Sequence, residues 1–183
     1  MLNGLSHVPF AALPSWDVTT RGTLVLTDGK EYLVREVDGR GNLVREYRGK
    51  SAPEVIPREE RRDSLAALRA RWDSVKAPAV QILGVPDEVR NLQLPTVYPP
   101  IMVTYAGVDG SVWVRRWVPG AGRRTVFEVF SSAGELLGVV TLPRFIVVLP
   151  APVLSFSGIS AIGVDPETGA HTVLSFSPAR RRP

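Results

Sequence analysis

The stretch VDGSVWVRRWVPGAGRRTVFEVFSSAGELLGVVTL, residues 108–142, decides the fold of this chain. It contains three runs rich in β-branched and aromatic residues, and Gly, Pro, Asp or Ser bound each run, as in turns. A further apolar run precedes it. Short apolar runs separated by tight turns predict an antiparallel four-stranded meander over residues 101–142. Its strands are expected at Ile101–Tyr105, Val112–Val118, Thr125–Phe130 and Leu136–Leu142.

The same pattern occurs earlier in the chain, over residues 15–47, where Asp28-Gly29 favours a hairpin turn. Gly41-Asn42-Leu43-Val44 corresponds to Gly134-Glu135-Leu136-Leu137, which lies 93 residues later. A repeated four-stranded unit of about 40 residues is typical of a β-propeller blade. The strands of this first unit are expected at Trp16–Val18, Thr23–Thr27, Tyr32–Val37 and Leu43–Tyr47.

A third unit, residues 145–177, is incomplete. Three strands are expected, at Phe145–Pro150, Gly158–Val164 and Ala170–Ser177, and the intervening Ala151–Ser157 is either a loop or an extra strand. A basic tail, residues 178–183, follows. The fold class predicted is therefore all-β: one domain over residues 1–183, a partial β-propeller of four-stranded antiparallel blades with two full blades and an incomplete third.

One α-helix is inserted between the first two blades. Residues 57–76 place Leu65, Leu68, Trp72 and Val75 on a single stripe, which predicts a helix over Arg58–Lys76. The proline-rich residues 77–100 then form a linker. The stripe is either a docking face or a partner-binding surface, which makes Trp72 a candidate contact residue.

Composition excludes several classes of function. The chain has 183 residues, a net charge of +4, two histidines and no cysteine, so disulfides, thiolate metal sites and cysteine nucleophiles are ruled out. The tail Arg180–Arg182 carries much of the excess charge, but no aromatic residues accompany it to stack on bases, so nucleic-acid binding is not expected. No apolar run is long enough for a membrane span.

The first residues lack the basic and apolar regions of a signal peptide. The expected location is the cytoplasm if Met1 is the true start. It is the cell envelope or the exterior if an upstream half is missing.

Two motifs resemble a known family. Asp109-Gly110-Ser111-Val112-Trp113-Val114-Arg115-Arg116 resembles the second strand of six-bladed, NHL-like or TolB-like bacterial β-propeller proteins. Phe127–Phe130 followed by Gly134–Gly138 resembles their third-to-fourth strand hairpin, although Phe127 and Ser131 stand where Trp and Asp are usual. The resemblance covers roughly Val8–Ser177, and its motifs are structural, so it carries over no catalytic residues.

The resemblance implies the C-terminal half of a six-bladed ring. Its partners are then a second copy, forming a homodimer, or a missing N-terminal half. The candidate for the absent fourth strand of the third unit is Leu2–Val8 of a second copy.

The candidate ligand surface consists of Arg115, Trp117, Arg123 and Arg124. Alternation places Arg115 and Trp117 on one strand face, where an arginine over a tryptophan can hold an anion or a sugar. The alternative is that these arginines only cover a packed blade. His171 with Asp165 and Glu167 is a weaker candidate for a metal or base site, because a hairpin turn also explains Asp165.

These observations predict a non-catalytic β-propeller module that binds a protein or a small ligand and needs no cofactor. The alternative is a fragment of a propeller hydrolase, similar to lactonases or arylesterases, with a channel metal. Asp17, Asp28 and Asp109 are the acidic side chains that this alternative would use.

Overall fold

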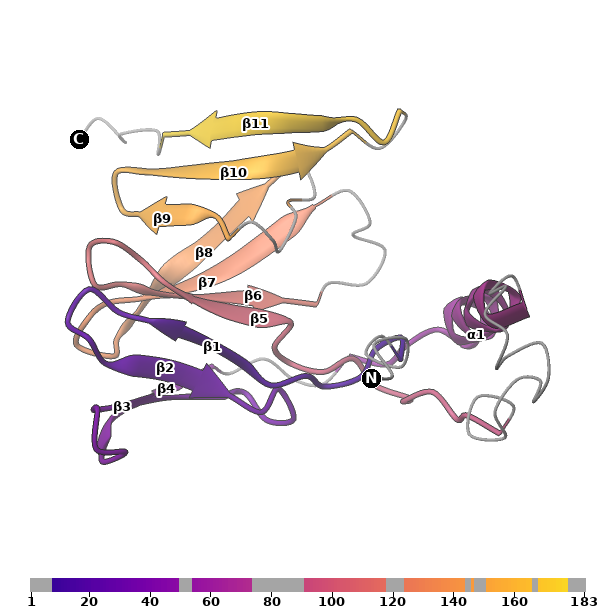
Figure 1. Cartoon of the computed structure of the whole chain (residues 1–183), viewed down its shortest axis with the longest axis horizontal. Helices are drawn as coiled ribbons and strands as arrows, with labels where there is room; N and C mark the ends of the chain where they lie inside the picture. The colour runs from indigo at the N-terminus through magenta and orange to yellow at the C-terminus, as the bar shows by residue number, and fades with distance from the viewer. Residues whose placement is uncertain are drawn as a thin grey trace. The chain divides into compact units, whose positions relative to one another are not determined.

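The computed structural model describes residues 8–49, 54–73, 91–117, 124–143, 146, 151–165 and 168–177. Figure 1 labels the helix and the strands of the chain, which divides into two compact units. One unit comprises Met1–Ala11 with Pro53–Tyr98, and the other comprises Ala12–Ala52 with Pro99–Pro183. The helical insertion lies in the first of these units and the sheets lie in the second.

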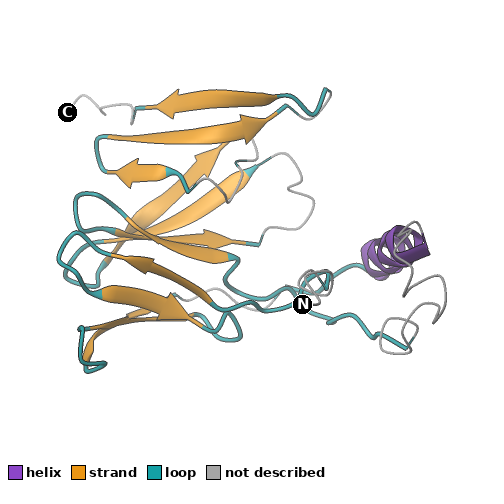
Figure 2. Cartoon of the chain, in the orientation of Figure 1, coloured by secondary structure: helices purple, strands orange, loops and turns teal. Residues whose placement is uncertain are grey.

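The larger unit contains three antiparallel sheets (Figure 2). The first sheet has the order β1-β2-β3-β4, the second has the order β5-β6-β7-β8, and the third has the order β11-β10-β9. The first two are the meanders that the sequence predicts, and the all-β fold class is confirmed. Their strands are β1 Ser15–Val18, β2 Leu24–Thr27, β3 Leu33–Val37, β4 Leu43–Arg48, β5 Val103–Ala106, β6 Val112–Arg116, β7 Thr125–Phe130 and β8 Leu136–Leu142.

Turn chemistry and register support the internal repeat. The Asp28-Gly29 turn joins β2 to β3, and Gly29 has φ +74° with the Leu13 carbonyl oxygen only 2.7 Å from where a Cβ would stand, so only glycine fits. The pairing of the third and fourth strands shifts register between Glu36 and Val37 in the first sheet, and between Val129 and Phe130 in the second. These two irregularities lie at positions related by the 93-residue repeat.

The third sheet differs from the sequence prediction at its first strand. β9 is Val153–Ser155, β10 is Gly158–Val164 and β11 is His171–Phe176. The ambiguous segment therefore supplies a strand, because Leu154 pairs with Ile159 of β10. Within the expected strand Phe145–Pro150 the structure describes only Ile146, which makes one isolated bridge to Gly163.

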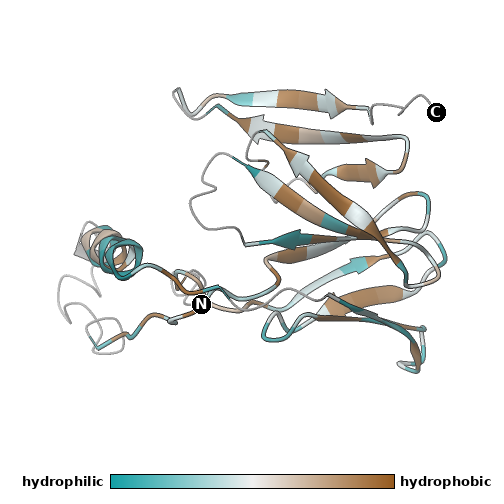
Figure 3. Cartoon of the chain, turned by 180° about the vertical axis from the view of Figure 1, so that it is seen from behind, coloured by the Kyte–Doolittle hydropathy of each residue, from teal (hydrophilic) through white to brown (hydrophobic). Residues whose placement is uncertain are grey.

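The second sheet packs against the other two through its two faces. The first interface, between the first and second sheets, and the second interface, between the second and third, each enclose a hydrophobic core. Figure 3 shows hydrophobic residues concentrated along the strands. The first core comprises Val25, Val34, Tyr47, Ile101, Val112, Val114 and Phe130, and the second comprises Tyr105, Trp113, Phe127, Val129, Leu142, Ile146, Leu154, Ile159 and Ala161.

The smaller unit contains α1, Arg58–Asp73, which begins directly after Pro57 as the sequence predicts. Leu65 and Leu68 of the predicted stripe are half-buried, whereas the predicted residues Val75 and Lys76 lie outside the described residues. Tyr98 donates to the Glu60 carboxylate at 2.6 Å and packs edge-on against Phe10. No helix in the described ranges is long and apolar enough to cross a membrane.

Candidate functional site

An apolar groove of about 480 Å³ lies in the larger unit between β8 and the third sheet. Trp113, Val129, Leu142 and Ile159 belong both to its lining and to the core of the second interface. The groove is therefore a continuation of that interface. Its volume lies within the roughly 300–1,000 Å³ of ordinary ligand sites.

The lining of the groove favours an apolar occupant. β8 contributes the unbroken run Leu137–Leu142 with Pro143 beyond it, and the third sheet contributes the rings of Phe156 and Phe176. The described residues that line it include no charged side chain; their polar side chains are the hydroxyls of Thr141, Ser155 and Ser177. A charged group placed here would lose hydration without gaining an ionic partner from the lining.

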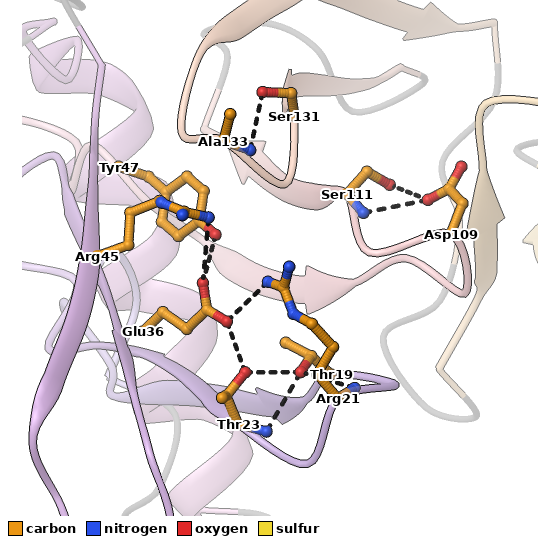
Figure 4. Close-up of polar contacts among 10 residues, drawn as sticks. All are labelled: Thr19, Arg21, Thr23, Glu36, Arg45, Tyr47, Asp109, Ser111, Ser131 and Ala133. Atoms are coloured by element: carbon orange, nitrogen blue, oxygen red, sulfur yellow. Dashed lines mark hydrogen bonds and ion pairs between the residues drawn. The ribbon is translucent and has the colours of Figure 1, made fainter.

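The first interface contains a buried carboxylate, that of Glu36 on β3, whose side chain is only 1% exposed (Figure 4). Arg21 donates to Oε1 at 2.8 Å and Thr23 donates to the same oxygen at 2.6 Å. Tyr47 donates to Oε2 at 2.7 Å, and Arg45 lies 3.9 Å from that oxygen. Both carboxylate oxygens thus have donors, as a buried charge requires.

These contacts set the protonation states of the cluster. Burial by itself raises the pKa of Glu36, but hydrogen bonds from Thr23, Tyr47 and Arg21 outweigh it and hold the pKa below its ordinary value. The pKa of Tyr47 is raised to about 12, mainly by burial and further by its hydrogen bond to the Glu36 carboxylate. At neutral pH the cluster therefore contains a carboxylate and a neutral phenol.

A second carboxylate enters the same interface from the opposite sheet. Glu128 on β7 is buried and accepts a hydrogen bond from Arg116 at 3.0 Å. Burial raises the pKa of Tyr32, and the nearby Glu128 raises it further. The first interface is thus a polar as well as an apolar contact.

The Asp109 turn, between β5 and β6, connects the second sheet to the third. Its carboxylate accepts hydrogen bonds from the Ser111 hydroxyl and amide, shown in Figure 4, and from the Phe156 amide. Ser111 in turn accepts from Trp113 Nε1 at 2.7 Å. Burial raises the pKa of Asp109, but these hydrogen bonds outweigh it and lower the pKa overall. The Asp-Gly-Ser-x-Trp motif is therefore explained by structure.

The prediction that Arg115 belongs to an exposed ligand surface is wrong. Arg115 is 1% exposed and donates to the Ile146 carbonyl oxygen at 2.7 Å, and burial lowers its pKa. Its face of β6 is covered by the third sheet, so the guanidinium does not reach solvent. Trp117 is half-buried, Arg124 is exposed, Arg123 lies outside the described residues, and so does the side chain of Trp72.

Of the weaker candidate, Asp165 and His171 lie at the two sides of the turn between β10 and β11, where Val164 pairs with His171. Asp165 accepts hydrogen bonds from the Thr168 amide at 2.9 Å and hydroxyl at 3.1 Å, as a hairpin turn requires. His171 is exposed on β11, and Glu167 lies outside the described residues. No group of three or more His, Asp or Glu that could hold a metal occurs among the described residues.

The acidic residues that the hydrolase alternative would use lie in structural contacts. Asp17 accepts from the Ala106 amide at 2.9 Å, which joins the first sheet to the second, and Asp28 accepts from the Lys30 amide at 2.9 Å. Their described contacts are explained without a metal, and the hydrolase remains a prediction.

Sequence reasoning missed the Glu36 cluster and the groove. A signal for the first was available, because alternation puts Glu36 on the same strand face as the apolar Val34. No local signal marks the groove, since its walls come from segments of two different sheets. Comparison with models of protein families found no match, and comparison with curated proteins found none either.

Proposed function

We propose that the chain is a non-catalytic module of the β-propeller type, which binds a protein or a small ligand and forms part of a larger, six-bladed ring. The observation that carries the proposal is the stacking of three consecutive sheets. Among the described residues, the second sheet packs against a neighbour on each face, whereas the first and third sheets each pack against one. Consecutive blades of a propeller stack in this way.

The outer faces of the two end sheets support the proposal. The first sheet exposes Trp16, which is 67% exposed, together with Val18 and Leu43. The third sheet exposes Val153 and Val173, the latter 79% exposed. Apolar side chains grouped on one face are typical of an interaction surface. We expect a further sheet to cover each of them.

A second copy of the chain is the simplest source of that cover. Two copies, each with three sheets, make a ring of six, in which the first sheet of one copy packs on the third sheet of the other. The alternative source is a set of further blades in another polypeptide. Leu2–His7, which were expected to complete the third sheet, lie outside the described residues.

Light scattering on the purified chain tests this proposal. We expect a particle of twice the 20.0 kDa chain mass. Trp16→Glu and Val173→Glu should each yield a monomer, because each places a charge on an end face. Val108→Glu is the matched control, since Val108 is similarly exposed but lies in the turn between β5 and β6. A soluble monomer at every concentration, with a cooperative melt, would contradict the proposal.

A further inference from the structure

β8 borders the groove along most of its length. A strand that lines a groove with a single face contributes every second residue, because successive side chains point to opposite sides. Here β8 contributes the consecutive residues Leu137–Leu142. Backbone of β8 therefore borders the groove, and among the described residues β8 is an edge strand of its sheet.

The edge of β8 lacks the features that protect an edge strand from pairing. Such strands usually carry charged residues or proline, which discourage the addition of another strand. β4, the corresponding edge of the first sheet, carries Arg45, Glu46 and Arg48. β8 has the sequence LLGVVTL, with no charge and no proline. The repeat therefore contains one protected edge and one unprotected edge.

The third sheet provides the opposite wall of the groove. In the described part of the chain it has three strands where the second sheet has four, and β11 is one of its two edge strands. Phe176 and Ser177, at the C-terminal end of β11, line the groove together with Phe156. An added strand would therefore meet a backbone edge on β8 and apolar rings on the third sheet.

We propose that this groove binds an extended segment of a partner polypeptide, which pairs through its backbone with the edge of β8. The segment is uncharged and has apolar residues at alternate positions, because every second side chain enters a lining without charged groups. A small apolar molecule would fill the groove but leave the N–H and C=O groups of the edge without partners. Strand addition satisfies both, as in other complexes of this kind. The site does not depend on how the end faces are covered.

Titration with a synthetic peptide tests the proposal. The probe is an acetylated and amidated peptide of sequence KTVTVTVK, in which one face is valine and the ends keep it soluble. We expect binding by calorimetry, together with slower amide exchange across Leu136–Leu142 by about tenfold or more, since paired edge amides exchange only when the pairing opens. The peptide with its residues scrambled is the control and should not slow exchange there.

Two N-methylated peptides separate backbone pairing from simple apolar binding. Methylation of the three valine nitrogens blocks one edge of the peptide, and methylation of the threonine nitrogens blocks the other. If the peptide pairs with β8 alone, one of the two binds like the parent and the other fails. Failure of both supports pairing with β8 and β11 together. Equal binding of both, or no binding of the parent, overturns the proposal.

Matched variants of the protein complete the test. Val139 is 57% exposed and pairs with Glu128, so its side chain points to the sheet face opposite the groove. Val139→Lys therefore leaves the lining unchanged but places a charge on the edge strand, which discourages strand addition, and it should weaken peptide binding by about tenfold, or 1.4 kcal/mol. Val44→Lys makes the same change on β4, where Val44 is 47% exposed, and should leave binding unchanged. Equal effects of the two variants, or none from Val139→Lys, overturn the assignment to β8. If the chain forms a dimer that both Val139→Lys and the peptide dissociate, the segment that binds the groove belongs to a second copy of this chain, and the proposal of a different partner is overturned.

Discussion

The interface between the first and second sheets encloses two carboxylates, whereas the interface between the second and third sheets encloses aromatic rings. In the first, Glu36 and Glu128 are buried with arginine donors. In the second, the Trp113 ring packs edge-on against Phe127 with centroids 5.6 Å apart. The second sheet nevertheless contributes one face to each interface.

Part of the difference originates at the position of Glu36 in the repeat. In the first sheet Val25 pairs with Glu36, and in the second sheet Trp113 pairs with Val129 at the corresponding place. A carboxylate at that position requires donors from its surroundings, which Arg21, Thr23 and Tyr47 supply. The buried carboxylate thus requires polar partners that the second sheet does not need, although the two sheets share the same strand order and register irregularity.

We expect the largest loss of unfolding free energy from a substitution in the aromatic interface between the second and third sheets. Trp113→Ala should lower the free energy of unfolding by about 3–5 kcal/mol, because it removes a large buried side chain and leaves a cavity. Urea denaturation measures the loss. Val108→Ala, at an exposed turn of the same sheet, should change stability by less than about 0.5 kcal/mol. A loss below 1 kcal/mol for Trp113→Ala would mean that the third sheet does not cover this face.

A smaller effect is expected from the polar interface. Glu36→Gln should cost about 2 kcal/mol at neutral pH, because it weakens hydrogen bonds to a charged acceptor. Glu46→Gln is the matched control: Glu46 pairs with Arg48 at 2.7 Å but lies near the surface, so we expect a change under about 0.5 kcal/mol. Similar losses for the two variants would show that burial of Glu36 contributes little.

The loss of stability caused by Glu36→Gln should depend on pH. The pKa of Glu36 is lowered on folding, so the unfolded state binds more protons near pH 4 and the carboxylate stabilises the fold above its unfolded pKa of about 4.3. The stability gap between the wild type and Glu36→Gln should therefore shrink as the pH falls below that value. Denaturation curves between neutral pH and pH 3 measure it, and a constant gap would contradict the ionised state.

The Asp109 turn should contribute less than either core. Asp109→Asn weakens the acceptor for the Ser111 and Phe156 amides, and we expect a loss of about 1–1.5 kcal/mol. The rate of hydrogen exchange at the Phe156 amide, on the third sheet, should also rise. Asp28→Asn, in the equivalent type of turn within the first sheet, should leave exchange at Phe156 unchanged.

The smallest effect is expected for the hydroxyl of Tyr47. Tyr47→Phe removes one donor from Glu36 and should cost about 1 kcal/mol at neutral pH. The folded pKa of Tyr47 is raised to about 12, so its contribution is complete below the unfolded pKa near 10 and is lost as pH rises through 12. Thermal melts of the two proteins should converge over that range. A gap that persists at high pH would contradict the raised pKa.

Local sequence patterns predicted most of the strands, the turns and the repeat. Val112–Arg116 and Thr125–Phe130 are strands because their β-branched and aromatic residues favour extended backbone, and Asp28-Gly29 turns because glycine accepts its positive φ. These preferences act over a few residues, so a linear pattern reveals them. Strand alternation likewise predicts that Glu36 shares a strand face with Val34, and Arg115 with Trp113.

Which strand faces are covered depends on contacts between distant segments, and these are seen only in the folded chain. Arg115 is buried because the third sheet lies on its face of β6, and that sheet comes from a segment more than 30 residues further along. The choice of Val153–Ser155 as β9 depends likewise on pairing with β10. The groove exists because two segments distant in sequence meet beside β8. Burial depends on contacts between distant segments, and local preferences do not encode them.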